Sequence, residues 1–262
     1  MPELPEVETR LIYFQNNLLG QQVDRVLVTA PNLIKSETAR VFARKLRGRR
    51  FVEAFRRGKY LLVTLDDGRV LVLHFGMGGD LHLYQTWRER PEYTRIEFIL
   101  IGGWRLAFTC PRKICRVMLV DKVDDVVALR EMGPEPAGKH FSLAYITRLC
   151  EESPARLIKP LLMDQRKIAG VGNIYADEIL FASRVRPDRR ASTLGEEELR
   201  RIHRETRRVL RRAIETAEED EFPADFLVSR DWRGAGCKLC GSPIERKKLS
   251  GRTAHFCPAC QV

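Results

Sequence analysis

The sequence predicts an α+β protein of several domains, because three patterns follow one another along its 262 residues. Short runs rich in β-branched and aromatic residues fill 23–120 and are separated by turn residues, which favours a β-sandwich. Helical periodicity replaces them after a Gly/Pro hinge at 133–136 and continues to about 219. Two Cys-x₂-Cys pairs follow near the end. We therefore expect domains at 1–132, 133–230 and 231–262.

The composition indicates a folded, basic protein. Lys plus Arg number 46 against 35 Asp plus Glu, giving a net charge of +11. Globular proteins this basic most often bind a polyanion, although a solvated basic surface without a partner is the alternative. A hydrophobic fraction of 44% supports packed cores. The sequence predicts neither a membrane span nor a signal peptide, since it has no run of eighteen apolar residues and begins with acidic residues and prolines.

The chain start carries the first candidate chemistry. A small second residue allows removal of the initiator methionine, which would leave Pro2 with a free secondary amine. Such an amine can attack a carbonyl-like carbon and form an iminium, and it titrates close enough to neutrality to be partly unprotonated. Glu3 beside it can give or take a proton. A frayed chain end is the other interpretation of these residues.

A helix is expected over 2–15, because apolar residues recur there at helical spacing. Its apolar face would anchor the chain start and hold Pro2 still, as a reactive terminus requires. The face consists of Leu4, Val7, Leu11 and Phe14.

Strands are expected where β-rich runs alternate with turns. Asp66-Asp67-Gly68 and Gly102-Gly103 are typical of hairpin turns. The predicted strands are 23–28, 60–65, 70–74, 96–101 and 104–108.

Three loops of this region carry candidate binding residues. The basic turn 56–60 contains Lys59, and on its residues alone it is a solvated charge cluster. In the loop 74–79, Met77 stands among glycines and is either an exposed wedge or part of the core. The third loop, 110–116, contains two cysteines and three basic residues.

Two helices are expected around a glycine-bearing turn at 170–172. Backbone N–H groups at a helix start can hold a phosphate, and Asn173 can add a side-chain donor. A plain helical hairpin, with glycines that only allow close packing, is the alternative.

A long helix should follow a capping box at Thr193–Glu196. One face is apolar, and the opposite face carries seven arginines. We favour a solvated face, balanced by Glu196–Glu198 and the acidic 218–221, over a DNA-facing stripe. The apolar face is Leu199, Ile202, Thr206, Val209 and Ala213, and the basic face is Arg200, Arg201, Arg204, Arg207, Arg208, Arg211 and Arg212.

The last region predicts a metal site. Cys237-x₂-Cys240 and Cys257-x₂-Cys260 supply four thiolates, the ligand set of a closed, structural zinc site. A basic hairpin at 244–255 lies between the pairs. The other three of the seven cysteines, Cys110, Cys115 and Cys150, are expected to be free thiols in a reducing cytosol.

The opening nine residues, Met-Pro-Glu-Leu-Pro-Glu-Val-Glu-Thr, resemble the signature of the formamidopyrimidine-DNA glycosylase / endonuclease VIII family. Residues 165–180 are similar to the family's Q-x-x-x-A-G-x-G-N-I-Y-A-D-E-x-L motif, and the G-P-E-P hinge and paired cysteines also match. The resemblance implies a two-layer β-sandwich, a helix–two-turns–helix domain and a zinc finger. It further implies a bifunctional DNA glycosylase and abasic-site lyase of base excision repair.

The resemblance also implies catalytic roles. Pro2 is expected to attack the sugar C1′ once the damaged base has left the stack, with Glu3 managing protons and Glu6 as a supporting carboxylate. Lys59 stands in a segment similar to the family's R-R-G-K-Y, and Arg252 in one similar to its G-R-x-T. Both are expected to assist beside the phosphates, although without the resemblance Arg252 is an ordinary hairpin arginine.

Five residues are expected to contact DNA on the same grounds. Met77 would enter the duplex where the damaged base was, and Arg112 would contact the orphaned base. Ile114 stands in place of the usual Phe wedge and cannot π-stack. Lys159 matches a lysine that faces the damaged strand, and Asn173 lies in the backbone-clamping motif.

Several departures put opposite-base selection and damage search in doubt. Cys110 and Cys115 replace the usual Asp and Gly, and a Cys where Gly is usual implies a different turn. A His-containing stretch of the family is absent from 91–95. The interval 218–236 is too short for the long lid of members specialised for 8-oxoguanine, so we expect weak excision of that base and better activity on abasic sites.

Two functions therefore stay open from sequence. One is the glycosylase/lyase, a monomeric cytosolic or nucleoid enzyme acting on damaged double-stranded DNA, with one zinc ion and no organic cofactor. The other is a non-catalytic binder of damaged or branched DNA on the same scaffold. The intact Pro2-Glu3 start favours the first, and the altered loop 110–115 favours the second.

Overall fold

The computed structural model describes residues 2–217, 222–227 and 236–262. The chain forms two compact units: Glu6–Glu131 with the chain start at Pro2, and Met132–Val262 with Glu3–Pro5. The predicted boundary between the second and third domains, at 230/231, lies outside the described residues. The division into three domains therefore stays a prediction.

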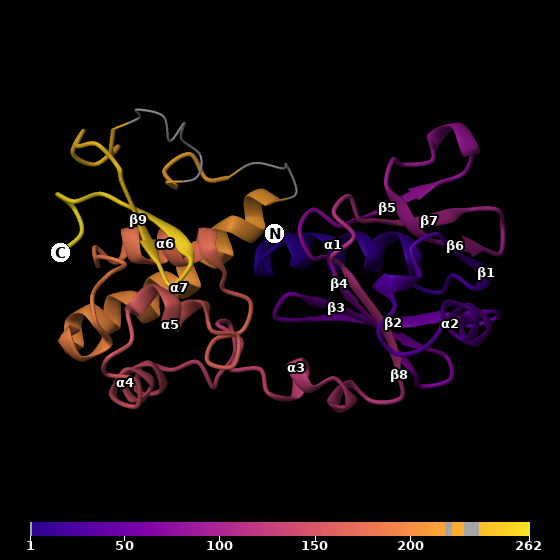
Figure 1. The fold of residues 1–262 in the computed structure, drawn as a ribbon, viewed down its shortest axis with the longest axis horizontal. Coiled ribbons are helices and arrows are strands. Elements are labelled where there is room, and N and C mark those ends of the chain that lie inside the picture. Colours follow the sequence, from indigo (N-terminus) through magenta and orange to yellow (C-terminus); the bar gives the residue numbers. More distant parts are fainter. Residues whose placement is uncertain (1, 218–221, 228–235) are drawn as a thin grey trace. The chain divides into compact units, whose positions relative to one another are not determined.

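The first unit contains two antiparallel four-stranded sheets, coloured indigo to magenta in Figure 1. Their strand orders are β1-β6-β7-β5 and β2-β3-β4-β8, which confirms the predicted sandwich. The strands are β1 (Val23–Val28), β2 (Phe51–Arg57), β3 (Tyr60–Leu65), β4 (Val70–His74), β5 (Asp80–Tyr84), β6 (Thr94–Leu100), β7 (Arg105–Thr109) and β8 (Arg116–Val120).

The N-terminal helix shares the core of the sandwich. Helix α1 (Leu4–Leu18) begins at Leu4 rather than Pro2 and continues past Gln15. Val7, Phe14 and Leu18 are fully buried in the cluster formed by both sheets. Burying such a side chain contributes roughly 1.5–3 kcal/mol, so this face ties the part of α1 that follows Pro5 firmly to the first unit.

Some elements of the first unit escaped the sequence pattern. Strands β2, β5 and β8 were not predicted individually, and α2 (Ala39–Leu46) lies where only strands were expected. The helix is only eight residues long, and of these Phe42 and Leu46 are buried. Its start is fixed by Thr38, whose side chain accepts a hydrogen bond from the Val41 N–H. A short helix, α3 (Val127–Arg130), ends this unit.

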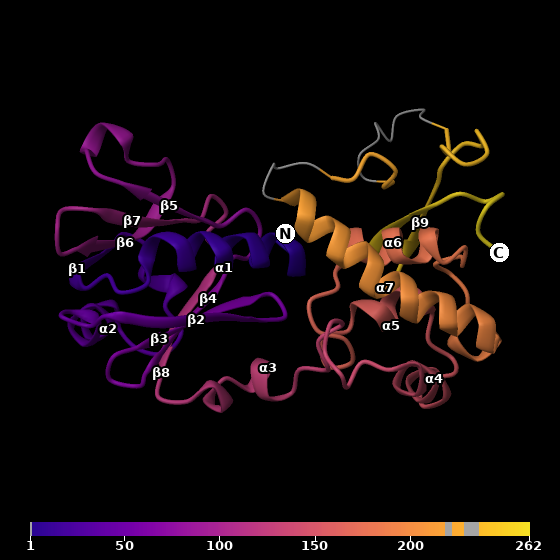
Figure 2. The same ribbon diagram turned by 180° about the vertical axis from the view of Figure 1, so that it is seen from behind.

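The second unit is helical, as predicted, and carries a two-stranded hairpin. Figure 2 shows the long helix α7 lying beside α6, with which it shares one apolar core. The elements are α4 (Leu143–Glu151), α5 (Ile158–Met163), α6 (Asn173–Ala182), α7 (Glu196–Ala217), β9 (Glu245–Leu249) and β10 (Arg252–Phe256).

Helix α7 buries the face that its periodicity indicated. All five residues of that face are buried. Most arginines of α7 form ion pairs or hydrogen bonds with other residues of this protein. Arg208 and Arg204 pair with the buried Glu205, Arg207 donates to the carbonyl of Phe141, and Arg212 pairs with Asp225. These contacts favour the solvated face over a DNA-facing stripe. The acidic 218–221 lie outside the described residues.

The predicted capping box at Thr193–Glu196 is wrong by two residues. The first helical bond of α7 runs from the Leu199 N–H to the Gly195 carbonyl, so Gly195 caps the helix. The Glu198 side chain reaches back to the Gly195 N–H at 2.8 Å. The Thr193 hydroxyl instead donates to the Arg190 carbonyl, because a 3₁₀ turn at Ala191–Thr193 precedes the helix.

Among the described residues, no helix is long and apolar enough to cross a membrane.

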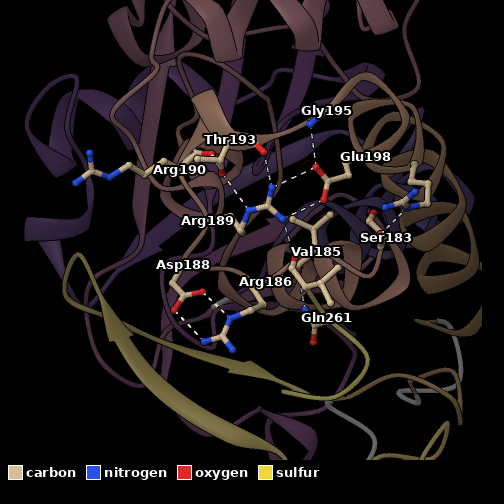
Figure 3. Close-up of polar contacts among 12 residues, drawn as sticks. Ser183, Val185, Arg186, Asp188, Arg189, Arg190, Thr193, Gly195, Glu198 and Gln261 are labelled. Atoms are coloured by element: carbon tan, nitrogen blue, oxygen red, sulfur yellow. Dashed lines mark hydrogen bonds and ion pairs between the residues drawn. The ribbon is translucent and has the colours of Figure 1, made fainter.

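The end of the chain is fastened to the helical part by a polar network, shown in Figure 3. The Gln261 amide donates to the Val185 carbonyl at 2.8 Å, and the same side chain accepts from the Cys257 N–H. Arg189 donates to the Val262 carbonyl and pairs with Glu198 on α7. The cysteine-bearing segment is therefore anchored within the second unit rather than attached only through the chain.

Candidate functional site

The carboxylate of Glu3 lies at the N-terminus of α6. Its two oxygens accept hydrogen bonds from the backbone N–H groups of Ile174, at 3.0 Å, and Tyr175, at 3.3 Å. The side chain is 2% exposed. The positive end of a helix stabilises a negative charge there, so the amides that we expected to be available for a phosphate hold Glu3 instead.

The glycine turn before α6 completes this attachment. The Leu4 N–H donates to the Gly170 carbonyl at 3.1 Å. Gly170 has a φ of +81°, and a Cβ there would lie 2.6 Å from the Cβ of Leu4. The Gln165 side chain spans the turn, since it accepts from the Gly170 N–H and donates to the Val171 carbonyl. The turn therefore does more than let two helices pack: it seats the residues that follow Pro2.

Pro2 itself is half-buried and directly precedes this fixed pair of residues. Because Glu3 and Leu4 are each held by backbone hydrogen bonds, the frayed-end interpretation does not fit the chain start. Glu6, one turn further along α1, is half-buried.

Lys159 is enclosed by protein, with 1% of its surface exposed. Its Nζ lies 2.8 Å from Asp177 Oδ1 on α6 and donates to the Thr253 carbonyl on β10 at 2.8 Å. Burial lowers the pKa of the Lys159 ammonium, and Asp177 opposes that shift. The contact of Lys159 with DNA stays a prediction; in this structure the side chain ties α5 and α6 to the hairpin.

Arg252 is exposed at the first position of β10. The hairpin turn before it uses left-handed backbone at Ser250 and Gly251, and Arg252 pairs with Leu249 of β9. Beyond it, the His255 N–H donates to Asp177 at 3.1 Å. A depression of about 230 Å³ beside Arg252 is also lined by Arg156 and Lys159. The hairpin therefore exposes the Arg252 guanidinium while Lys159 and Asp177 hold its β10 strand by hydrogen bonds.

Lys59 lies in a two-residue hairpin turn between β2 and β3, and it is 6% exposed. The ring of the adjacent Tyr60 lies 4.7 Å from that of His74. Burial, with Arg116 and Lys59 nearby, lowers the pKa of His74 to about 4. At neutral pH the imidazole is therefore uncharged, and its Nδ1 accepts a hydrogen bond from the Gly76 N–H at 3.3 Å.

The loop that His74 begins exposes Met77, of which 38% is accessible, so the core-packing alternative is wrong. Met77 Sδ lies 3.5 Å from Nη1 of the exposed Arg112. Ile114, two residues further, is 49% exposed. The structure thus brings three of the five predicted DNA contacts together on two adjacent loops of the first unit. The other two, Lys159 and Asn173, belong to the second unit.

Cys110 and Cys115 are joined by a disulfide, which corrects the prediction that both are free thiols. The spacing of the cysteines in the sequence did not reveal this disulfide, because two cysteines five positions apart can pair only if the loop between them turns back. Lys113 supplies that turn with a φ of +53°. Cys150, by contrast, is a buried free thiol as predicted, and burial raises its pKa to about 11.

The four remaining cysteines form a cluster whose sulfur atoms all lie within 4.8 Å of one another. The Sγ atoms of Cys237 and Cys260 are 3.8 Å apart, and those of Cys240 and Cys257 are 3.5 Å apart. Zinc–sulfur bonds of about 2.3 Å in a tetrahedron place sulfurs about 3.8 Å apart. The site therefore fits one structural zinc ion with four thiolates.

Two acidic residues of α6 were missed by the sequence analysis. Asp177 is the partner of Lys159 described above, and Glu178 accepts from the Leu227 N–H at 2.8 Å. Both are at most 3% exposed. The signal was present, because they are the only carboxylates in a helix that is otherwise almost entirely apolar, and buried charges need partners.

Known proteins match the chain along its length. Residues 1–117 match the formamidopyrimidine-DNA glycosylase N-terminal domain, 132–221 the H2TH domain of the same proteins, and 237–262 a zinc finger found in FPG and IleRS. The formamidopyrimidine-DNA glycosylase of Thermus thermophilus is 39% identical over 276 residues, covering 100% of this chain and 98% of its own. That of Pelotomaculum thermopropionicum is 37% identical over 275 residues, covering 100% and 99%.

Solved structures agree. The crystal structure of the MutM (FPG) protein from Thermus thermophilus superposes with a TM-score of 0.85 at 39% identity, covering 99% of this chain and 98% of that one. The Lactococcus lactis formamidopyrimidine-DNA glycosylase bound non-covalently to DNA containing an AP site has a TM-score of 0.88 at 28% identity, with 99% of each chain covered. Three domain models in the right order, full-length relatives and a shared fold place this chain in the formamidopyrimidine-DNA glycosylase family.

Proposed function

We propose that this chain is a bifunctional DNA glycosylase with abasic-site lyase activity, acting on damaged double-stranded DNA in base excision repair. The observation that carries the proposal is the seating of Glu3: a buried carboxylate held by two amides of α6, directly after the residue whose amine would react. Relatives support it, since the Lactococcus lactis protein was solved with DNA containing an abasic site.

The reaction follows from an amine at Pro2. Its nitrogen attacks C1′ of the flipped nucleotide, and the base leaves with the electron pair of the glycosidic bond and takes up a proton. The Pro2 nitrogen, after losing its proton, expels the ring oxygen O4′ from C1′, and O4′ takes up a proton as the sugar ring opens. The open-chain iminium that results acidifies the C2′ hydrogens. Loss of one of them expels the 3′-phosphate and nicks the strand, and water then releases the sugar from Pro2. No organic cofactor takes part in these steps.

The other predicted catalytic residues have supporting roles in this proposal. Glu3 exchanges the protons that base departure and elimination require, and Glu6 is a second carboxylate nearby along the chain. Lys59 and Arg252 neutralise phosphate charge that develops as the strand breaks. Arg252 is suited to this because it is exposed on a hairpin that Lys159 and Asp177 hold in place.

Recognition of the lesion is assigned to the exposed loop residues. Met77 fills the gap left by the flipped base, as apolar wedges do in other DNA-bending proteins. Arg112 reads the orphaned base opposite, and Ile114 separates it from its neighbour. Asn173, at the start of α6, acts from the second unit on the damaged strand, and the buried Lys159 supports this by holding the hairpin that carries Arg252. We further propose that the enzyme works as a monomer in the bacterial cytosol or nucleoid.

Borohydride trapping on abasic DNA tests the proposal. Borohydride reduces the iminium between Pro2 and the sugar to a stable bond, so a covalent protein–DNA adduct should appear only if the amine works. A non-catalytic binder, which the altered loop 110–115 favours as the second candidate, would shift the DNA in a gel without any adduct.

Arg252→Ala should weaken the salt dependence of DNA binding. Each phosphate that a basic side chain neutralises adds to the slope of log affinity against log salt, so losing one contact should flatten it by roughly one unit. Binding isotherms over a range of salt measure this. Arg200→Ala is the matched control, because Arg200 is an exposed arginine paired with Glu196 on the solvated face of α7. Equal slopes for Arg252→Ala and the unchanged protein would remove Arg252 from the phosphate contacts.

Excision of 8-oxoguanine opposite cytosine should be slow relative to nicking of abasic DNA. The interval 218–236 is short for a lid over a flipped purine, and a pocket without a lid lacks hydrogen bonds that separate an oxidised purine from a normal one. Apart from 222–227 and residue 236, this interval lies outside the described residues. Single-turnover rates on the two substrates decide the point. Comparable rates would mean that the pocket recognises the purine without a long lid.

A further inference from the structure

The loop between β7 and β8 is closed into a ring by the Cys110–Cys115 disulfide, whose Cα atoms are 6.3 Å apart. Both cysteines are at most 1% exposed. The four residues between them, Pro111–Ile114, are all exposed. The disulfide is therefore buried at the end of the β-sandwich. Arg112 and Ile114, which lie within the ring, are exposed.

The ring packs tightly against the loop 74–79, which carries Met77. A Cβ at Gly76 would lie 2.8 Å from the Ile114 carbonyl oxygen, and one at Gly79 would lie 2.8 Å from Cys115 Sγ. The same sulfur lies 3.1 Å from the Phe75 carbonyl oxygen. These contacts hold the two DNA-facing loops, 74–79 and 110–116, firmly against each other, and the buried disulfide is part of the contact.

We propose that Cys110–Cys115 is a thiol–disulfide modification site that locks the opposite-strand reading loop and so sets how well the enzyme distinguishes the base opposite the lesion. The inference rests on the proposed function for the role of Arg112 and Ile114. It goes beyond that function in assigning a covalent switch to the loop. The amine chemistry at Pro2 does not depend on the lock.

The chemistry is ordinary thiol–disulfide exchange with a dithiol. One thiolate of the dithiol attacks Sγ of Cys110 or Cys115, the protein S–S bond breaks, and a mixed disulfide forms. The second thiol of the reagent then displaces the protein sulfur. Two electrons and two protons pass to the cysteine pair, and the reagent becomes a cyclic disulfide. A small-molecule disulfide reverses the reaction and is itself reduced to thiols.

Burial of both sulfurs determines how this site responds. Exchange requires access to a sulfur atom, so the loop must open before a reductant can attack. Exchange is therefore slow in the folded protein, and slower still when DNA covers the exposed residues. The bond acts as a lock set before DNA is bound, and a reduced loop has more conformations in which Arg112 is misplaced. A reading residue must be held closely to discriminate between bases.

The test compares oxidised and dithiol-treated protein with the variants Cys110→Ser/Cys115→Ser and Cys110→Asp/Cys115→Gly. The second variant carries the residues usual in the family, so it covers the case in which the serine pair fails to fold. Cys150→Ser is the matched control, a buried cysteine outside the ring. Zinc content is measured throughout, because dithiols also bind zinc.

Three readouts separate the outcomes. Peptide mapping without reductant should find a 110–115 crosslink in the oxidised protein. The ratio of rates for one lesion opposite cytosine and opposite adenine should fall about tenfold on reduction, and dithiol should leave this ratio unchanged in both ring variants. Borohydride trapping on abasic DNA should stay within about twofold throughout.

Absence of the crosslink overturns the inference, as does a rate ratio that is the same with and without it. A dithiol effect that persists in the ring variants assigns the effect to the zinc cysteines and also overturns it. If no form of the protein is trapped on abasic DNA, the proposed function fails instead. The crosslink measurement distinguishes this failure from failure of the disulfide inference, because it does not depend on enzyme activity.

Discussion

Pro2→Gly is expected to reduce nicking of abasic DNA by about 100-fold or more, with DNA binding nearly unchanged. The pyrrolidine ring fixes the nitrogen relative to Glu3, which α6 holds, and misplacing a reacting atom by about 1 Å can cost about 100-fold. A secondary amine also yields a charged iminium directly, whereas a glycine amine yields an imine that must first be protonated. The hydrogen bonds that hold the chain start are made by Glu3 and Leu4 rather than by the Pro2 ring, so binding should persist.

Single-turnover nicking and borohydride trapping measure this effect, with mass spectrometry to establish that Met1 has been removed from both proteins. Pro154→Gly is the control, because it makes the same chemical change at an exposed proline of the second unit. Full nicking by Pro2→Gly would show that another group is the nucleophile.

Cys257→Ser should remove the zinc and unfold the finger, with loss of most DNA affinity. The cluster offers four sulfur ligands, and zinc binding to such sites is worth on the order of 10 kcal/mol of folding free energy. The apolar cluster at the finger is small, because it consists of Phe181, Leu227 and two of the cysteines, with Ile244 and Cys260 beside them. Arg252 on β10 would lose its support along with the hairpin.

Metal analysis should give about one zinc per chain for the unchanged protein and none for Cys257→Ser, and titration with a chelator should reproduce the variant's loss of binding. Cys150→Ser is the matched control, since Cys150 is buried in the helical core and lies outside the cluster. A folded, DNA-binding protein without zinc would refute the assignment.

The local sequence already determined the zinc site and the sandwich. Ligands two residues apart on a knuckle converge on one metal whatever the rest of the fold does, so the paired Cys-x₂-Cys motifs are sufficient evidence. Strands β1, β3 and β4 were predicted with the observed bounds because their apolar runs end at clear turns. The apolar face of α7 followed from its period in the same way.

Local pattern failed where an element is short and buries few side chains. The helix α2 and the strands β2, β5 and β8 are five to eight residues long and bury two side chains each, and helix and strand periods are hard to tell apart over such short runs. Packing against the sandwich fixes them instead, since tertiary contacts override weak local preference.

The candidate site shows the same division. Pro2 and Glu3 could be predicted as catalytic residues from sequence because their chemistry depends on residue type and adjacency. The tertiary structure alone decided what holds them: the amides that bind Glu3 lie 171 and 172 positions away in the chain. It also placed Lys159 inside against Asp177 and closed the Cys110–Cys115 ring. The type of a residue determines which reactions and contacts its side chain is capable of. Which of these the side chain makes depends on its burial and on partners far away in the sequence, and only the folded chain supplies those.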